Sequence, residues 1–552
     1  MLVSATILAL AIPSHAQGLP DLGDSSDAVI SAQQERTIGK RIMLEIRADR
    51  AFVEDAELSD YISGLGNRMI AASRGSTNDN RRDFEFFLLN DEAINAFALL
   101  GGFVAIHSGL FLTTTNESEL AGVMGHEIAH ILQRHQSRGA DEQRKNAPLQ
   151  LAMLAGAILA ARSNSSSSGQ ATEAIIASSA ALSYQNQLNY TRDFEREADR
   201  LGLLVMSQAG FDPHGMPGFF ERMLRANRHN DGKTPGYLRT HPLTTERIAE
   251  MQDRVASMGN GGKRAVSNSG ASFSTESRGS NPGSVPDSVE YKLARAKLRA
   301  MSMSAFEAVT FFKGEIAAST VMRNRADSYG LTLALMQSRQ FGAAEKELAT
   351  IRNWGGAGNT GGHPWIENLA AQIKNGERKF DDALAIYKTA MKIFPGNRAL
   401  SYGYIETLYE AGQIDAALLA ANEQIKNSVD DPRLYELAAK GYERKSKRLA
   451  EHKAIGEAYY RRGNLMGAIQ QFEIAVKAKD GDFYESSGAE SRLRELKLEF
   501  RNRPLLPGEK RDKELDKELD KEWGKEKPAI ASKPVPPKST AAQGPARDVF
   551  PR

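Results

Sequence analysis

The sequence predicts a mostly helical α+β protein, in which a domain with a short β-sheet precedes a solenoid of helical repeats. Two observations predict this fold class. In the first half of the chain, two short apolar runs with strand character, residues 84–89 and 102–107, interrupt stretches of helical periodicity. In the second half, an apolar residue followed three positions later by alanine recurs within continuous helical patterning. The chain has 552 residues, and at roughly 100–200 residues per domain we expect about three units.

The composition excludes several classes of protein. Apolar residues make up 41% and charged residues 25%, which is typical of a folded globular protein. The 71 basic and 69 acidic residues give a net charge of +2, so a nucleic-acid-binding protein is not expected. The chain has no cysteine, which excludes disulfides, cysteine proteases, thiolate zinc fingers and a lipid-modified cysteine anchor. Any metal must therefore be bound by His, Asp or Glu.

The N-terminus predicts export. Residues 2–13 form an uncharged apolar run, and a small-x-small pattern of the kind that signal peptidase cuts ends at Ala16. The run is shorter than the roughly 20 residues that a spanning helix needs, and no other segment reaches that length. No Lys or Arg precedes it, and an amphipathic helix or an uncleaved anchor is the alternative. We expect a signal peptide over residues 1–16 and a mature protein that begins near Gln17.

The first domain, residues 17–256, is predicted to mix helices with a small sheet. Residues 28–75 carry apolar positions at helical spacing, and the two strands follow at 84–89 and 102–107. The segment between these strands is suited to pair at the edge of the sheet and there to bind an extended substrate: Asn95, Ala96, Phe97 and Ala98.

Two longer helices follow in this domain. The first is predicted from Thr115 or Asn116 to about His135. Either residue can cap its start, and Glu119 lies three residues after Asn116, as a capping box requires. The second is predicted over residues 189–209, where a glycine ends it.

Three further segments have distinctive compositions. The apolar stretches at 149–161 and 174–182 are too short to cross a membrane, and we expect a helical hairpin or mobile lid; contact with a membrane surface is the alternative. Residues 257–286 are rich in Ser, Gly and Asn, which predicts a flexible linker. Residues 501–552 contain a charged run and a Pro-rich end, which predicts disorder.

The region 287–500 is predicted to be helical and repetitive. The alanines of the recurring pattern are 39, 34 and 51 residues apart. Thirty-four is the period of the tetratricopeptide repeat (TPR), and 51 is one and a half periods. TPR units stack into a curved solenoid whose concave face binds peptides or proteins, and a generic helical bundle is the alternative. The pattern occurs at Phe341/Ala344, Phe380/Ala383, Ile414/Ala417 and Leu465/Ala468.

The chemistry is indicated by residues 126–130, which match the motif HExxH. His126 and His130 share one helix face, so both imidazoles can bind one metal ion, and Glu127 can take a proton from the bound water. Zn²⁺ lowers the pKa of that water to about 7. An accidental match is expected in about one chain in a hundred, and two histidines on a solvated helix face are the alternative. His135 lies about 140° around the helix from His130 and is expected to be a histidine at the helix C-terminus rather than a ligand.

A third ligand is expected from the later helix, which contains two glutamates. Either Glu195 or Glu197 could bind the metal. Asp199 is four residues after Glu195 and shares its face, whereas Glu197 points the opposite way. We therefore favour Glu195 as the ligand. Asp199 would then accept a hydrogen bond from the ring N–H of a histidine ligand, and Glu197 would be a surface carboxylate. One zinc ion per chain is expected.

These His-x-x-x-His and Glu-x-x-x-Asp pairs resemble a family of zinc metallopeptidases that includes the CAAX prenyl protease and the bacterial HtpX membrane protease. Two further elements agree with the resemblance. The segment from Leu89 to Gly102 resembles the family's substrate-edge segment, and Thr240-His241-Pro242 with Arg247 resembles its second signature. The family usually has Pro where this chain has Leu100, a difference confined to a local turn.

The resemblance implies a small gluzincin-type domain with Glu127 as general base. It also implies that His241 and Arg247 lie near the scissile carbonyl, where they would stabilise the oxyanion. In soluble relatives the matching histidine can instead coordinate the zinc and hold the enzyme inactive, and a loop histidine before proline is a further alternative for His241. The implied zinc ligands are His126, His130 and Glu195.

The order of parts resembles the periplasmic chaperone/proteases of this family over residues 28–500. This implies a periplasmic endopeptidase that degrades misassembled outer-membrane β-barrel proteins and assists their assembly. Its TPR face would hold a client or the barrel-assembly machinery. The alternative is a chaperone or adaptor scaffold with a latent, gated protease site. The long linker and the charged tail depart from the pattern of these relatives.

Overall fold

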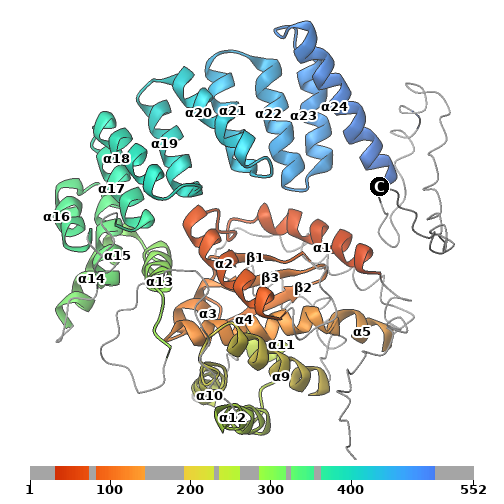
Figure 1. Ribbon diagram of the computed structural model, residues 1–552, viewed down its shortest axis with the longest axis vertical. Coiled ribbons are helices and arrows are strands. Elements are labelled where there is room, and N and C mark those ends of the chain that lie inside the picture. Colours follow the sequence, from red (N-terminus) through yellow and green to blue (C-terminus); the bar gives the residue numbers. More distant parts are fainter. Residues whose placement is uncertain are drawn as a thin grey trace, which may run out of the picture.

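The structure, a computed structural model, contains a part with a β-sheet and an arc of paired helices that lies against it (Figure 1). The predicted signal peptide and the hairpin at 149–182 lie outside the described residues, as does nearly all of the tail. Among the described helices, none is long and apolar enough to cross a membrane. The described residues are 31–73, 83–142, 192–228, 235–260, 285–318, 325–352 and 362–503, together with Lys517.

The sheet has three strands, β1 (Glu85–Leu89), β2 (Ala96–Leu99) and β3 (Phe103–His107), in the order β1-β3-β2. β1 runs parallel to β3 and β2 antiparallel to it, with Ala96 opposite Ile106. The predicted strands are thus present, and β2 lies at the edge as expected. Gly101 and Gly102 make the turn between β2 and β3 with φ of 81° and 94°, a conformation that favours glycine.

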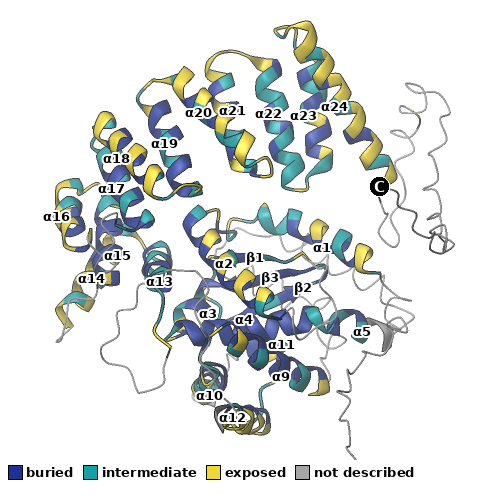
Figure 2. Cartoon of the chain, viewed as in Figure 1, coloured by how far each residue is buried: buried dark blue, intermediate teal, exposed yellow. Residues whose placement is uncertain are grey.

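The central helix of this part is α4 (Glu117–Leu132), whose residues are buried from Glu117 to Ile131. Figure 2 shows α4 and the sheet in dark blue, the colour of buried residues. Asn116 caps α4 by accepting a hydrogen bond from the Glu119 N–H at 3.0 Å. The other helices that the structure describes in this part are α1 (Ala32–Arg47), α2 (Ala56–Ser73), α3 (Ser108–Thr113), α5 (His135–Glu142), α9 (Arg192–Gln208), α10 (Gly215–Arg228), α11 (Gly236–Thr240) and α12 (Thr245–Asn260).

The predicted end of this central helix is wrong. α4 ends at Leu132, and Arg134 has a φ of 51°, which breaks the helix. His135 is therefore the first residue of α5 rather than a histidine at the C-terminus of α4. The physical reason is a long-range contact, because the Glu35 carboxylate of α1 accepts hydrogen bonds from Arg134 Nε at 3.1 Å and Nη2 at 2.9 Å.

Two glycines bring α4 and α9 into close contact. A Cβ on Gly125 would lie 2.9 Å from the carbonyl oxygen of Gly202. A Cβ on Gly202 would lie 2.9 Å from the backbone nitrogen of His126. Only glycine at these two positions allows the helices to approach this closely, and the approach sets the distance between the HExxH motif and the carboxylates of α9.

The helical arc confirms the predicted repeat. Each apolar-x-x-Ala pattern begins a helix, so that Phe341 is the first residue of α16 (Phe341–Ile351) and Ala344 the fourth. The alanines are fully buried where helices meet, as Ala383 and Ala468 show. The spacing of 51 residues arises because the last pattern begins α23 (Leu465–Lys477). The complete helix pair α21 (Pro432–Arg444) and α22 (Arg448–Arg461) separates it from the pattern before. The helices of the arc are α13 (Val289–Met301), α14 (Ala305–Ala318), α15 (Arg325–Gln337), α16 (Phe341–Ile351), α17 (Pro364–Gly376), α18 (Phe380–Ile393), α19 (Arg398–Glu410), α20 (Ile414–Asn427), α21 (Pro432–Arg444), α22 (Arg448–Arg461), α23 (Leu465–Lys477) and α24 (Phe483–Asn502).

The arc is tied to the first part by buried polar contacts. Lys297 of α13 lies 2.6 Å from the Glu57 carboxylate of α2, which also accepts a hydrogen bond from Asn368 at 2.7 Å. The carboxylate of Glu117, the first residue of α4, accepts a hydrogen bond from the N–H of Ser288 at 2.9 Å. One hydrophobic core runs through both parts. The arc is therefore packed directly onto the helices that support the candidate site.

Candidate metal centre

The two histidines of the HExxH motif face one point. Four-residue spacing on α4 places their Nε2 atoms 3.0 Å apart, and both side chains are fully buried. Burial lowers the pKa of His130 to about 3, which leaves its imidazole neutral. A neutral imidazole is the form that binds a metal.

Glu195 reaches this point from α9. Its Oε2 lies 3.4 Å from His126 Nε2, and its Oε1 lies 3.4 Å from His130 Nε2. Burial alone would raise the pKa of Glu195, but the nearby histidine rings hold it well below its usual value. The carboxylate is therefore ionised and turned toward the two histidines. Glu197, on the other face of α9, contacts a different histidine, His135, at 3.1 Å.

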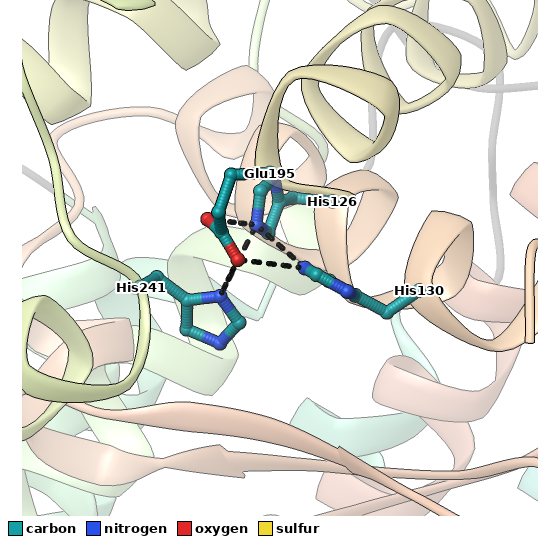
Figure 3. A group of neighbouring side chains, drawn as sticks. All are labelled: His126, His130, Glu195 and His241. Atoms are coloured by element: carbon teal, nitrogen blue, oxygen red, sulfur yellow. Dashed lines mark hydrogen bonds and ion pairs between the residues drawn. The ribbon is translucent and has the colours of Figure 1, made fainter. Parts of the chain in front are cut away.

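His241 completes the group from the loop after α11. Its Nδ1 lies 3.0 Å from Glu195 Oε1 and 3.4 Å from His126 Nε2. The ring is buried and stacks on Tyr237, with ring centroids 4.7 Å apart. The histidine donors and the carboxylate, drawn in Figure 3, lie within 4.8 Å of one another. The structure thus places His241 among the donors rather than on an outer loop.

Glu127 is buried beside this group. In the described part of the chain, neither of its carboxylate oxygens has a hydrogen-bond partner, although His241 Nε2 lies 3.5 Å from Oε1. An unbonded buried carboxylate is costly, so a group in this position is expected to bond a ligand or a water molecule.

Asp199 and Arg247 support the donors from behind. Asp199 Oδ1 lies 3.0 Å from His126 Nδ1, and Arg247 Nε and Nη2 donate to its two oxygens at 2.8 Å. Arg247 Nη1 lies 2.8 Å from Glu195 Oε2. The contacts with His126 and Arg247 lower the pKa of Asp199 against the effect of burial. The carboxylates of Asp199 and Glu195 likewise raise the pKa of His126 to about 9, so metal binding has to displace a proton from this ring. The contacts of Arg247 therefore favour a positioning role, and its role at the scissile carbonyl stays a prediction.

The edge strand β2 lies next to the donors. Asn95 O accepts the His107 N–H of β3 at 3.0 Å, so the alternate backbone groups of Ile94, Ala96 and Ala98 face away from the sheet. Tyr237 N–H donates to Ile94 O at 3.1 Å, and the side chain of Gln136 donates to Ala98 O. The α11 segment that carries His241 is thus bonded directly to the edge. Sequence reasoning missed Tyr237 and Gln136, because no local pattern distinguishes them.

The donor set suits zinc. Zinc in proteins is bound tetrahedrally by His nitrogen and carboxylate oxygen, and a catalytic site has three protein ligands and one exchangeable position. His126, His130 and Glu195 would hold the ion with two nitrogens and a carboxylate, and His241 offers a fourth donor within 4.8 Å of them. Asp199 behind His126 is the kind of support that zinc-binding histidines have.

Comparisons with known proteins agree with this geometry. The model of Peptidase family M48 matches residues 58–255, and a tetratricopeptide repeat model matches residues 375–441. The beta-barrel assembly-enhancing protease of Escherichia coli O157:H7 is 32% identical over 469 residues, which cover 85% of this chain and 89% of that protein. The chain belongs to peptidase family M48. The putative beta-barrel assembly-enhancing protease of Vibrio cholerae is 35% identical over 356 residues, 63% of this chain and 67% of the relative.

Another metalloendopeptidase matches a smaller share of the chain. The mitochondrial metalloendopeptidase OMA1 of Schizosaccharomyces pombe is 32% identical over 214 residues, which cover 39% of this chain and 58% of that protein. M48 metalloproteases are zinc-dependent, and the His126, His130, Glu195 and His241 group is suited to one metal ion. The chain is thus an M48 metalloprotease with a C-terminal TPR array.

Proposed function

We propose that this M48 metalloprotease is a periplasmic zinc endopeptidase that degrades misassembled outer-membrane β-barrel proteins and assists their assembly. The observation that carries the proposal is the buried donor group with the unbonded Glu127 carboxylate beside it. The Escherichia coli O157:H7 relative, which is named for barrel assembly, aligns over 85% of the chain and therefore over most of the helical arc, and this supports the substrate class. In this proposal residues 1–16 are the signal peptide and 17–256 the peptidase domain.

The residues have distinct roles in the proposed reaction. His126, His130 and Glu195 hold the zinc, which when bound polarises a carbonyl and lowers the pKa of water. Glu127 takes the proton of the attacking water and passes it to the leaving amine. Its buried, unbonded oxygens leave it able to accept that proton.

The substrate would bind as an extended strand at β2. The outward groups of Ala96 are suited to pair with it, and Asn95 and Phe97 flank this position. Because Tyr237 and Gln136 already bond Ile94 and Ala98, binding along the full edge requires that these two contacts be released. The α11 segment would then move together with His241.

One observation favours a second function, a chaperone or adaptor with a latent protease. His241 lies 3.0 Å from Glu195 and 3.4 Å from His126, so with zinc bound it would compete with a substrate carbonyl for the metal. A site held in this arrangement is closed until His241 leaves. The helical arc would then provide the main functional surface, binding a client or the barrel-assembly machinery.

Barrel assembly in cells separates the two functions. We expect that Glu127→Gln, in the full chain, loses degradation of a misassembled barrel protein but still supports assembly of a correctly targeted one, because the helical arc is untouched. The measurement is the amount of folded and degraded barrel protein in cells that produce either form. Loss of both activities would contradict an independent role of the arc, and retention of degradation would contradict the protease assignment.

A further inference from the structure

Two residues outside the expected ligand set, His135 and Glu197, lie directly behind His130. The Nδ1 atoms of His130 and His135 are 2.9 Å apart, and His135 Nε2 lies 3.1 Å from Glu197 Oε2. His135 comes from the first turn of α5 and Glu197 from α9, so two separate elements converge on the back of His130.

The direction of these hydrogen bonds follows from metal binding. If His130 binds the metal through Nε2, its Nδ1 must carry the hydrogen. This N–H then donates to His135 Nδ1, which must accept. His135 consequently carries its hydrogen on Nε2 and donates it to Glu197. The three residues thus form a one-way chain of donors that ends on a carboxylate.

The His135 ring is fixed in this orientation. It is fully buried and stacks on Phe194, with ring centroids 4.6 Å apart and an angle of 11° between the planes. Glu197 is 28% exposed, and Arg138 Nη1 holds it at 2.9 Å. The Arg138 guanidinium also lies 4.7 Å from the centroid of the Phe194 ring. This series of hydrogen bonds therefore has the packed His135 ring in its middle and the Glu197–Arg138 ion pair at its end.

We propose that His135 and Glu197 are positioning residues that hold His130 as a metal ligand. The proposal rests on the zinc ligand set proposed above. Asp199 supports His126 by direct contact at 3.0 Å, and Glu197 supports His130 through His135. Each histidine ligand would then have its own carboxylate, and all three acids of the Glu195–Asp199 segment would serve the metal. Outer supports of this kind typically change metal affinity by about 10–100-fold.

The test is the zinc dissociation constant of full-length variants, measured by competition with a chelator. We expect His135→Leu to weaken zinc binding by about 10–100-fold, because it removes the acceptor for His130 Nδ1–H. His135→Asn should lose less, because its amide oxygen can accept in place of Nδ1. Glu197→Ala should also weaken binding, and the double variant His135→Leu/Glu197→Ala should bind as His135→Leu does, because Glu197 acts only through His135.

Several outcomes would overturn the proposal. Zinc binding by His135→Leu within about twofold of wild type, or additive losses in the double variant, would exclude the chain of donors. If His135→Leu does not fold, zinc binding by His135→Asn and by Glu197→Ala decides between these outcomes. Glu197 is partly exposed, so its replacement should leave the fold intact. Glu246→Ala is the matched control: Glu246 is an exposed acid paired with Arg196, and its loss should leave affinity unchanged. Glu195→Gln tests the ligand set separately, because normal zinc binding by that variant would contradict the ligands rather than their support.

Discussion

Replacing Glu127 by Gln is expected to lower cleavage of an unfolded barrel protein by about 10²–10⁴-fold while the zinc content stays at the wild-type level. Gln has nearly the shape of Glu but cannot take a proton from water. Glu127 is not among the clustered metal donors, so its loss should not release the metal. The measurement is the initial rate of cleavage together with the zinc content of the same sample.

Measuring the cleavage rate and the zinc content of the same sample distinguishes loss of the general base from loss of the metal. A zinc-loaded Glu127→Gln that cleaves at the wild-type rate would contradict the role of Glu127 as general base. A variant that has lost its zinc would show that Glu127 helps to hold the metal, and this would contradict the division of roles proposed above.

Replacing Arg247 by Ala is expected to destabilise the metal-free protein by about 3–5 kcal/mol, because it leaves buried carboxylates without their cation. Arg247 is 4% exposed and lies within 2.8 Å of both Asp199 and Glu195. Its loss would also free Asp199 from its fixed position behind His126. The measurement is the melting temperature, with zinc affinity as a second readout.

A matched control lies on the same helix. Arg254 is exposed on α12, and Arg254→Ala should change stability by no more than about 0.5 kcal/mol. Arg247→Lys should retain part of the stability, because it keeps the charge but not the two-pronged contact with Asp199. If Arg247→Ala melts and binds zinc as the wild type does, the support of the ligands by Arg247 is disproved.

Features set by local spacing could be predicted from the sequence. Helical geometry alone turns His126 and His130 to one side, and it separates Glu195 from Glu197. The TPR pattern is also local, because a buried alanine is needed in each pair of helices, as at Ala383. These features depend on residues a few positions apart, so long-range contacts do not alter them.

The parts that could not be predicted depend on contacts between distant elements. A continuous helix would turn His135 away from the metal, but the break at Arg134, bound by Glu35 of α1, returns it to His130. Nothing near His135 in the sequence indicates this break. Likewise, Glu197 is a support rather than a plain surface carboxylate only because α5 starts where it does.

The placement of Arg247 and of the helical arc has the same origin. Arg247 reaches Asp199 because α12 packs beside α9, a contact between residues 48 positions apart. The arc is fixed to the peptidase part by Lys297 and Glu57, which are 240 positions apart. Sequence periodicity identifies such elements but does not state which faces meet.

The decisive measurement is the zinc content of the purified full chain, wild type and Glu195→Gln, together with cleavage of an unfolded barrel protein by the same samples. The assignment of Glu195 as a zinc ligand predicts one zinc per wild-type chain with cleavage, and a Glu195→Gln variant that loses both, because Glu195 faces both histidines at 3.4 Å. A wild-type chain without zinc, or a Glu195→Gln variant that keeps zinc and activity, would contradict it.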